Sequence, residues 1–201
     1  MAVHLKPLDQ QVMVLTGASS GIGLCTAILA AERGAKLVLV ARSEDTLQEL
    51  VSQIKSNGGD AIYVTADVAD REQMLDVALA AVNQYGRIDT WVNDAGVSSY
   101  SRLDEISEAD SRRIFDTNFW GVVNGSLVAL PYLRKQGGAL INLGSEVSEA
   151  AAPLLVSIKR NAFPKPSVNF SKSSLYRKIL CFSKLKSPLG RITFLLSVII
   201  R

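Results

Sequence analysis

The glycine-rich segment of this chain is Thr16-Gly17-Ala18-Ser19-Ser20-Gly21-Ile22-Gly23. It follows a short apolar run, residues 11–15, and precedes residues 22–33, whose apolar residues recur at helical spacing. Glycines at G-x-x-x-G-x-G spacing let the backbone turn tightly and admit a pyrophosphate against the helix N-terminus, where N–H groups and the helix dipole favour anions. A turn that only lets strand and helix pack closely is the alternative. The strand–turn–helix context favours a dinucleotide site.

Strand and helix patterns continue to alternate up to about residue 145. Predicted strands cover residues 11–15, 36–41, 61–65, 90–93 and 139–143, and predicted helices cover residues 22–33, 43–57, 70–85 and 108–133. Residues 36–41 are continuously apolar after the first position, as expected for a strand buried on both faces. This alternation with short links predicts an α/β fold, a Rossmann-type doubly wound parallel sheet of about five strands. Cys25, Trp91 and Trp120 are expected to pack in its core.

Charge divides the chain into two parts. Of the 22 Lys and Arg residues, 12 precede residue 150, as do all 19 Asp and Glu residues; the other 10 cations lie in an acid-free segment, residues 150–201. After residue 155 the sequence is rich in Ser and Lys and has no sustained period. We therefore predict a folded domain over residues 1–155 and a disordered basic tail over residues 156–201. Its cations are scattered, so neither nucleic acid nor membrane is an expected partner.

Targeting and metal signals are weak. Residues 1–10 lack the apolar run of a secretory signal, and the apolar stretch 192–200 is shorter than the roughly 20 residues that span a bilayer. Two cysteines, Cys25 and Cys181, make no disulfide framework. These features predict a cytoplasmic location. The single histidine, His4, has no partners for a metal site, so no metal is expected.

Five motifs in order resemble those of the short-chain dehydrogenase/reductase family, over about residues 8–155. They are the glycine loop (Gly17, Ser19, Ser20, Gly21, Ile22, Gly23), Asp67-Val68, Asn93-Asp94-Ala95-Gly96, Asn118 and Ser145. The resemblance implies that the loop, Asp67, Val68, Asn93, Ala95 and Gly96 bind the cofactor, with Asp67 at the adenine ring. It also implies catalytic roles for Asn118 and Ser145. Asp94 departs from the family's Asn-Asn-Ala-Gly element.

The choice of cofactor is read at the end of the second predicted strand. NAD-binding members of the family carry an acidic residue where this chain has Ala41, and Arg42 follows. A guanidinium can bind a 2′-phosphate through two hydrogen bonds. NADP(H) is therefore favoured over NAD(H), although Glu44 lies nearby and Arg42 as an ordinary solvated arginine is the alternative.

The family's acid–base pair, Tyr-x-x-x-Lys, is missing from its expected place. Thirteen residues after Ser145 stands Ile158, and four further stands Ala162. The only later tyrosine, Tyr176, is followed at the same spacing by Leu180. Because the family's reaction interconverts a carbonyl and an alcohol by hydride transfer and needs a proton donor, we expect this chain to be inactive. If it were active, a small-molecule carbonyl or alcohol would be its substrate.

Two interpretations remain open. The first is a C-terminally truncated or frame-shifted family member, whose last predicted strand is left as an uncovered edge and whose homo-oligomer interface is lost. Reading the other two frames of the DNA tests it: without Tyr-x-x-x-Lys codons just downstream, the frameshift hypothesis fails. The second is a non-catalytic dinucleotide-binding or interaction protein.

Overall fold

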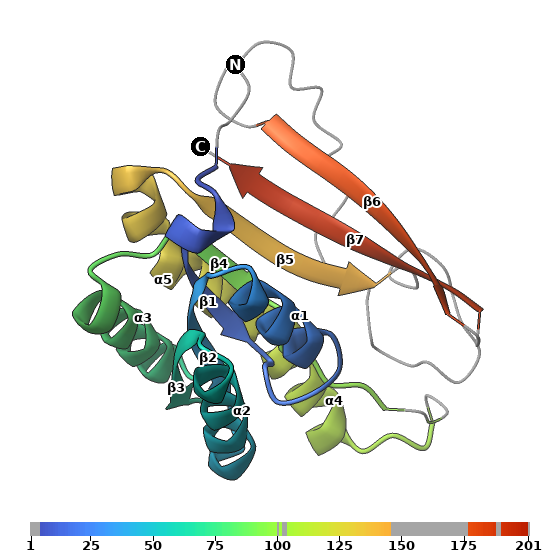
Figure 1. The fold of residues 1–201 in the computed structure, drawn as a ribbon. Helices are drawn as coiled ribbons and strands as arrows, with labels where there is room; N and C mark the ends of the chain where they lie inside the picture. Colours follow the sequence, from blue (N-terminus) through green and yellow to red (C-terminus); the bar gives the residue numbers. More distant parts are fainter. Residues whose placement is uncertain (1–4, 100, 102–103, 146–176, 188–189, 201) are drawn as a thin grey trace.

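The centre of the molecule is a seven-stranded sheet with the order β3-β2-β1-β4-β5-β7-β6 (Figure 1). The computed structural model describes residues 5–99, 101, 104–145, 177–187 and 190–200. The strands are β1 (Val12–Thr16), β2 (Lys36–Ala41), β3 (Asp60–Thr65), β4 (Thr90–Asn93), β5 (Ala139–Ser145), β6 (Arg177–Ser187) and β7 (Gly190–Ile200). Strands β1 to β5 are parallel, with Val14 of β1 level with Val38 of β2 and Trp91 of β4. The predicted parallel α/β sheet is confirmed.

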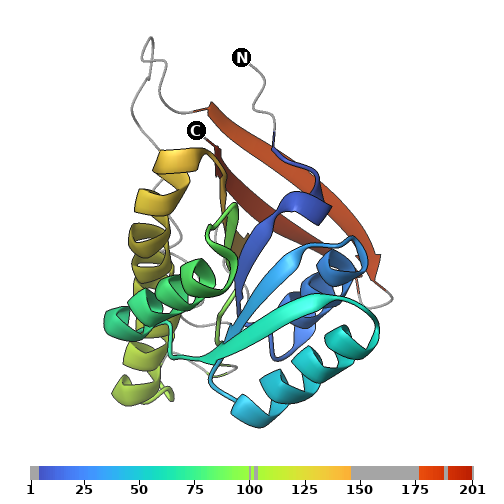
Figure 2. The same ribbon diagram turned by 60° about the vertical axis from the view of Figure 1, so that its left-hand side comes forward.

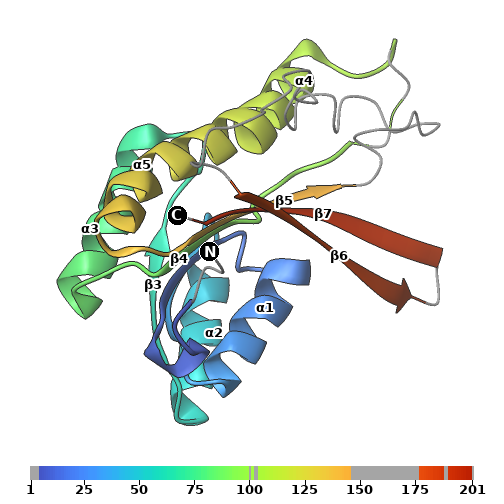
Figure 3. The ribbon, with the colours of Figure 1, turned by 90° about the horizontal axis from the view of Figure 1, so that it is seen from above.

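Helices cover both faces of the parallel strands. They are η1 (Leu8–Gln10), α1 (Gly21–Glu32), α2 (Glu44–Ser56), α3 (Arg71–Tyr85), α4 (Glu108–Phe115), η2 (Asp116–Trp120) and α5 (Gly121–Gln136). Seen along the sheet, α1 and α2 lie on one face, and α3, α4 and α5 lie on the other (Figure 3). Helices α3 and α5 run side by side, as Figure 2 shows. This two-sided cover is the doubly wound arrangement.

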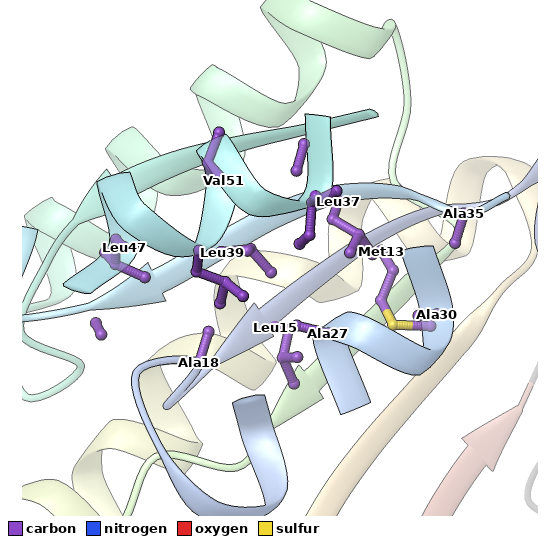
Figure 4. Packing of buried hydrophobic residues seen from close by; sticks show 14 of the residues in the cluster. Met13, Leu15, Ala18, Ala27, Ala30, Ala35, Leu37, Leu39, Leu47 and Val51 are labelled. Atoms are coloured by element: carbon purple, nitrogen blue, oxygen red, sulfur yellow. The ribbon is translucent and has the colours of Figure 1, made fainter. Parts of the chain in front are cut away.

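Alternate side chains of the central strands supply two separate cores. Met13 and Leu15 of β1 pack with Leu37 and Leu39 of β2 under α1 and α2 (Figure 4). Val14 points the other way and joins the cluster beneath α3 and α5. Both sets are buried, because successive residues of a strand face opposite sides of a sheet that is covered twice.

The long helix predicted over residues 108–133 consists of three pieces. Helix α4 ends at Phe115, the π-helical turn η2 covers Asp116–Trp120, and α5 begins at Gly121. The helical direction continues, since Asp116 and Gly121 keep right-handed helical angles. A π-turn widens the helix by one residue and recurs at functional sites. Here it carries Asn118.

The C-terminal part differs from the sequence-based expectation. Residues 177–187 and 190–200, inside the predicted disordered tail, form β6 and β7, so the sheet has more than five strands. β7 pairs antiparallel with β5, placing Phe194 opposite Ser145, and β6 pairs with β7. Strand β5 is therefore not the uncovered edge that was expected, because β7 pairs with its backbone. The rest of the tail lies outside the described residues.

Two residues expected in the core are exposed, and one is confirmed there. Trp91 is fully buried. Helix α1 buries Gly23, Ala27 and Ala30 against the sheet. Cys25 lies midway between Gly23 and Ala27 in the sequence, so its side chain is on the opposite face of the helix and is exposed. Trp120 is 48% exposed and meets Phe119 edge to face.

Candidate functional site

A pocket of about 310 Å³ lies where the parallel strands end, at their carboxyl edge. Its lining comes from the loops after β1, β2, β3 and β4, from the end of β2, from the start of α1 and from η2. The lining residues are Gly17, Ser19, Ser20, Gly21, Ile22, Val40, Ala41, Arg42, Ala66, Asp67, Val68, Asp94, Ala95, Gly96, Val97 and Thr117. Ligands of doubly wound sheets bind at this edge, where the strand order reverses direction. In this sheet the reversal falls between β1 and β4.

Two glycines of the loop are required by close backbone approach. Gly17 has φ +75°, and a Cβ there would lie 2.8 Å from the Ala95 nitrogen. A Cβ on Gly23 would overlap the Gly17 carbonyl oxygen and lie 2.7 Å from Oδ2 of Asp94. Gly21 has φ +56° with open space where a Cβ would lie. Replacing it with another residue would therefore cause backbone strain but no steric clash. The loop thus turns tightly and leaves its outer side open to a ligand.

The N-terminus of α1 presents polar groups to the same opening. Ser20 is the N-cap residue, but its side chain accepts no capping hydrogen bond from the helix backbone. Exposed Ser20 and half-buried Ser19 both line the pocket. The helix N–H groups that Ser20 leaves uncapped, together with two hydroxyls, form a donor set suited to phosphate oxygens. The residues present therefore fit a pyrophosphate.

Thr16 organises the loop that follows β4. Its buried hydroxyl donates to the Val92 carbonyl (3.2 Å) and accepts from the backbone nitrogens of Asp94 (3.1 Å) and Ala95 (3.2 Å). All three hydrogen bonds join the last residue of β1 to the carboxyl end of the neighbouring strand β4 and the loop that follows it. This hydroxyl holds the wall of the pocket that Asp94, Ala95 and Gly96 form. This role of Thr16 was not predicted from the sequence, although its position as the last residue of a buried strand, directly before the glycine loop, could have indicated it.

Asp94 places a carboxyl group beside the glycine loop. It is half-buried, and its carboxylate accepts a hydrogen bond from the backbone N–H of Gly23. Burial raises the pKa of Asp94 from its usual 3.8 to about 6, and the bond from Gly23 opposes that shift. Having Asp94 in place of the family's asparagine thus puts a titratable group beside the first turn of α1.

Arg42 lies at the end of β2 and lines the pocket with an exposed side chain. Its nearby acid, Glu44, accepts a hydrogen bond from the Tyr63 hydroxyl at 3.3 Å. Within the described part of the chain, no hydrogen bond or ion pair of the Arg42 guanidinium is found. Its five N–H donors are therefore directed neither to Glu44 nor to another described residue.

The loop after β3 is held in place by α5. Asp67 accepts from the Ala69 nitrogen (3.0 Å), and the buried amide of Asn124 donates to the carbonyls of Val68 (3.1 Å) and Ala69 (3.0 Å). A Cβ on Gly121 would lie 2.5 Å from Val68, so α5 packs directly on this loop. The role of Asn124 in holding this loop was also not predicted, because an asparagine within a helical pattern does not indicate which loop it contacts.

Asn93 is not part of the pocket lining. Its 4%-exposed side chain accepts from Trp91 Nε1 (2.9 Å) and donates to Asn142 Oδ1 (2.8 Å) and Ser126 Oγ (3.2 Å). A Cβ on Gly125 would overlap Oδ1 of the Asn93 side chain. This network joins β4, β5 and α5. Asn93 supports the sheet behind the site, whereas Ala95 and Gly96 reach the pocket.

Asn118 and Ser145 lie at the same edge of the sheet. The Asn118 amide makes two 2.8 Å hydrogen bonds with the backbone of Val97, accepting from its nitrogen and donating to its carbonyl. The side chain is thus engaged with the wall of the pocket and not directed at a ligand. Ser145 is the last residue of β5; its side chain lies outside the described residues, as do Ile158, Ala162 and Tyr176.

The described residues contain no group of three or more His, Cys, Asp and Glu side chains placed to hold a metal ion. Among the helices described, none has the length and apolar character needed to cross a membrane.

The parallel sheet, the glycine loop at the start of α1 and the pocket beside it define a Rossmann-type nucleotide-binding protein. A family model described as short chain dehydrogenase matches residues 11–157. The chain belongs to this family, which confirms the resemblance predicted over about residues 8–155.

Curated relatives share the same part of the chain. An uncharacterized oxidoreductase of Bacillus subtilis, YxnA, is 50% identical over 145 residues, which are 71% of this chain and 41% of that protein. The 11-beta-hydroxysteroid dehydrogenase A of Sesamum indicum is 42% identical over 145 residues, 71% of this chain and 42% of that protein. The chain thus spans about two fifths of the length of these relatives.

Solved structures show the same fold. An alcohol dehydrogenase from the archaeon Thermococcus sibiricus, complexed with 5-hydroxy-NADP, is 30% identical with a TM-score of 0.70, covering 74% of this chain and 63% of that one. A short chain dehydrogenase/reductase from Burkholderia phymatum, in complex with NAD, is 30% identical with a TM-score of 0.74, covering 78% and 57%.

Proposed function

We propose that this chain binds NADP(H) in the pocket at the carboxyl edge of its sheet. The observation that carries the proposal is the convergence, around about 310 Å³, of the glycine loop, the start of α1 and Arg42. The structural relatives with bound NADP or NAD derivatives support a nicotinamide dinucleotide. A dinucleotide exceeds this volume, but the pocket is open at its outer side, where Arg42 is exposed.

Each part of the lining has a separate task in this proposal. The N–H groups at the start of α1 and the hydroxyls of Ser19 and Ser20 bind the pyrophosphate. Arg42 binds the 2′-phosphate, because its guanidinium is not paired with Glu44. Asp67 and Val68 contact the adenine, on a loop that Asn124 fixes. Asn118 holds Val97 in the wall of the pocket.

The reduced cofactor of this family supplies a hydride to a carbonyl carbon, and a proton must reach the carbonyl oxygen. None of the five tyrosines in the sequence has a lysine four residues later. Without that pair no phenol is poised to donate, since an unassisted tyrosine has a pKa near 10. We therefore propose that the chain binds the dinucleotide but does not turn over a carbonyl or alcohol substrate efficiently. Asn118 and Ser145 are what remains of the catalytic set.

Fluorescence titrations with NADPH and NADH test the choice of cofactor. We expect NADPH to bind at least about tenfold tighter, because one charge-assisted bidentate contact contributes roughly 1.5–3 kcal/mol. In Arg42→Ala, NADPH affinity falls to that of NADH, while NADH affinity is unchanged. Arg33→Ala, which removes an exposed arginine from the C-cap of α1, is the matched control. Equal binding of both cofactors by the unmodified protein would refute the NADP(H) proposal.

The second candidate function is that of a non-catalytic protein that uses the bound dinucleotide as a ligand. The absence of Tyr-x-x-x-Lys from the sequence favours it. Binding accompanied by carbonyl reduction excludes it, and binding without reduction supports it.

A further inference from the structure

Asp94 lies against the part of the pocket that the proposed function assigns to the pyrophosphate. Hydrogen bonds from its backbone nitrogen and that of Ala95 to Thr16 fix the chain at this point. From there its carboxylate reaches the first turn of α1, where it accepts from the Gly23 N–H. Its Oδ2 is close enough to meet a Cβ on Gly23 at 2.7 Å. A carboxylate thus stands at the helix end that attracts an anionic ligand.

Few charged groups face this carboxylate. The first turn of α1 has no acidic side chain, and residues 16–24 contain no charged residue at all. From the ends of β2 and β3, Arg42 and Asp67 line the same pocket. Asp116 of η2 is exposed next to Thr117, and the neighbouring β5 presents the uncharged Asn142. Among the described residues, no cation forms an ion pair with Asp94.

An ionised Asp94 and a bound pyrophosphate would place like charges around one helix end, in a partly desolvated pocket where repulsion is poorly screened. Protonation removes the repulsion and converts the carboxylate into a donor. The carboxyl O–H can then bond to a phosphate oxygen, while its other oxygen keeps the Gly23 N–H. The proton comes from the solvent, one for each ligand bound.

We propose that Asp94 couples dinucleotide binding to the uptake of one proton, so that the site prefers its ligand with this carboxyl neutral. The inference rests on the proposed function, because it concerns the same pocket. It adds a residue that selects the charge state of the site. Since burial brings the pKa of the free carboxyl to about 6, the coupling operates near neutral pH.

Calorimetric titration with ADP-ribose tests the coupling. This probe carries the pyrophosphate but no 2′-phosphate, whose own titration near pH 6 would confuse the result. We expect affinity to rise about tenfold for each pH unit lowered from 8 to 6, and to level off below pH 6. At pH 7, titrations in buffers of different ionisation enthalpy should show close to one proton taken up per ligand.

Two variants complete the experiment. Asp94→Asn keeps the size and an acceptor for Gly23 but cannot ionise, so we expect tighter binding at pH 7.5, no proton uptake and no dependence on pH. Asp76→Asn removes an equal charge from the exposed surface of α3 and should behave as the unmodified protein. If Asp94→Asn fails to fold, proton uptake by the unmodified protein still decides the matter.

The outcomes separate the two proposals. Failure of the unmodified protein to bind either ADP-ribose or NADPH overturns the proposed function, and the coupling with it. Binding of ADP-ribose with no proton uptake at pH 7 overturns the coupling alone. So does proton uptake that persists in Asp94→Asn, because another group would then be its source.

Discussion

Strands β1 to β5 and strands β6 and β7 extend one sheet in different ways. The parallel strands are joined by crossovers through helices, so their connecting loops gather at one edge and form the pocket. β6 and β7 are antiparallel neighbours, separated in sequence by only Pro188 and Leu189. An antiparallel pair needs only a turn, whereas a parallel pair needs a crossover. Strands β6 and β7 therefore widen the sheet, while the pocket is lined by residues that follow the parallel strands.

The largest expected effect comes from closing the glycine loop. In Gly23→Ala the new methyl would overlap the Gly17 carbonyl and crowd Asp94, so the loop must open. We expect dinucleotide affinity to fall at least about a hundredfold, with a loss of roughly 2–3 kcal/mol in unfolding free energy. NADPH titration and urea denaturation measure the two quantities.

Gly58→Ala is the matched control for this substitution. Gly58 also has a positive φ, +83°, but open space where a Cβ would lie, and it does not line the pocket. We expect about 1 kcal/mol of destabilisation and unchanged affinity. Equal losses of affinity in both variants would show that binding follows global stability and not the shape of the loop.

Asn93→Ala tests the support behind the pocket. It leaves Trp91 Nε1–H and the Asn142 oxygen without their buried partner. A buried unsatisfied group costs about 1–3 kcal/mol, so we expect a loss of about 2 kcal/mol in unfolding free energy. Affinity measured well below the unfolding midpoint should change less than twofold, since Asn93 does not line the pocket. A large loss of affinity in a folded variant would place Asn93 in the site after all.

Ser197→Pro addresses the antiparallel side of the comparison. β7 lies between β5 and β6, with residue 197 level with Asn142 and Leu180, and proline cannot donate to either ladder. We expect a loss of about 1–2 kcal/mol in unfolding free energy, with NADPH affinity unchanged. If the variant loses NADPH binding while it stays folded, the two regions are not as separate as proposed.

Asp94→Asn has the smallest expected effect on stability. The folded-state pKa of Asp94 is raised, so its favourable contribution is present at acid pH and is lost as pH rises through about 6. At pH 7.5 the variant should be more stable by about 1 kcal/mol, after allowance for partial solvent screening. At about pH 3, below the ordinary pKa of 3.8, the two proteins should unfold at the same urea concentration. A difference that does not vary with pH would point to packing as its cause.

The parallel half of the fold was largely predictable from local pattern. Residues 36–41 and 90–93 form strands with the predicted bounds, because the first is buried at every position after Lys36 and the second is buried at all four positions. The π-helical turn at Asp116–Trp120 could not be predicted. A helical period does not show that the Asn118 amide will bind Val97, which is distant in the sequence. Strand β7 was not predicted either, although the apolar stretch 192–200 that forms most of it contains β-branched residues, which are typical of strands.

The candidate site was predictable to the extent that its residues belong to one loop. Gly17, Ser20 and Gly21 share a segment whose spacing alone indicates a turn before a helix. The place of Asn93 outside the pocket depends on tertiary contacts with Trp91 and Asn142. The state of Asp94 depends on how deeply the loop after β4 packs against α1, which no local pattern records.

Residues 12–145 are proposed to bind the dinucleotide although the sequence lacks the acid–base pair. One measurement tests this proposal directly: NADPH is titrated into the full chain, and small carbonyl compounds are then added while the absorbance of the reduced nicotinamide is followed. We expect saturable binding to one site per chain and no consumption of NADPH above the rate without protein. Steady carbonyl-dependent consumption, or no binding at all, would contradict it.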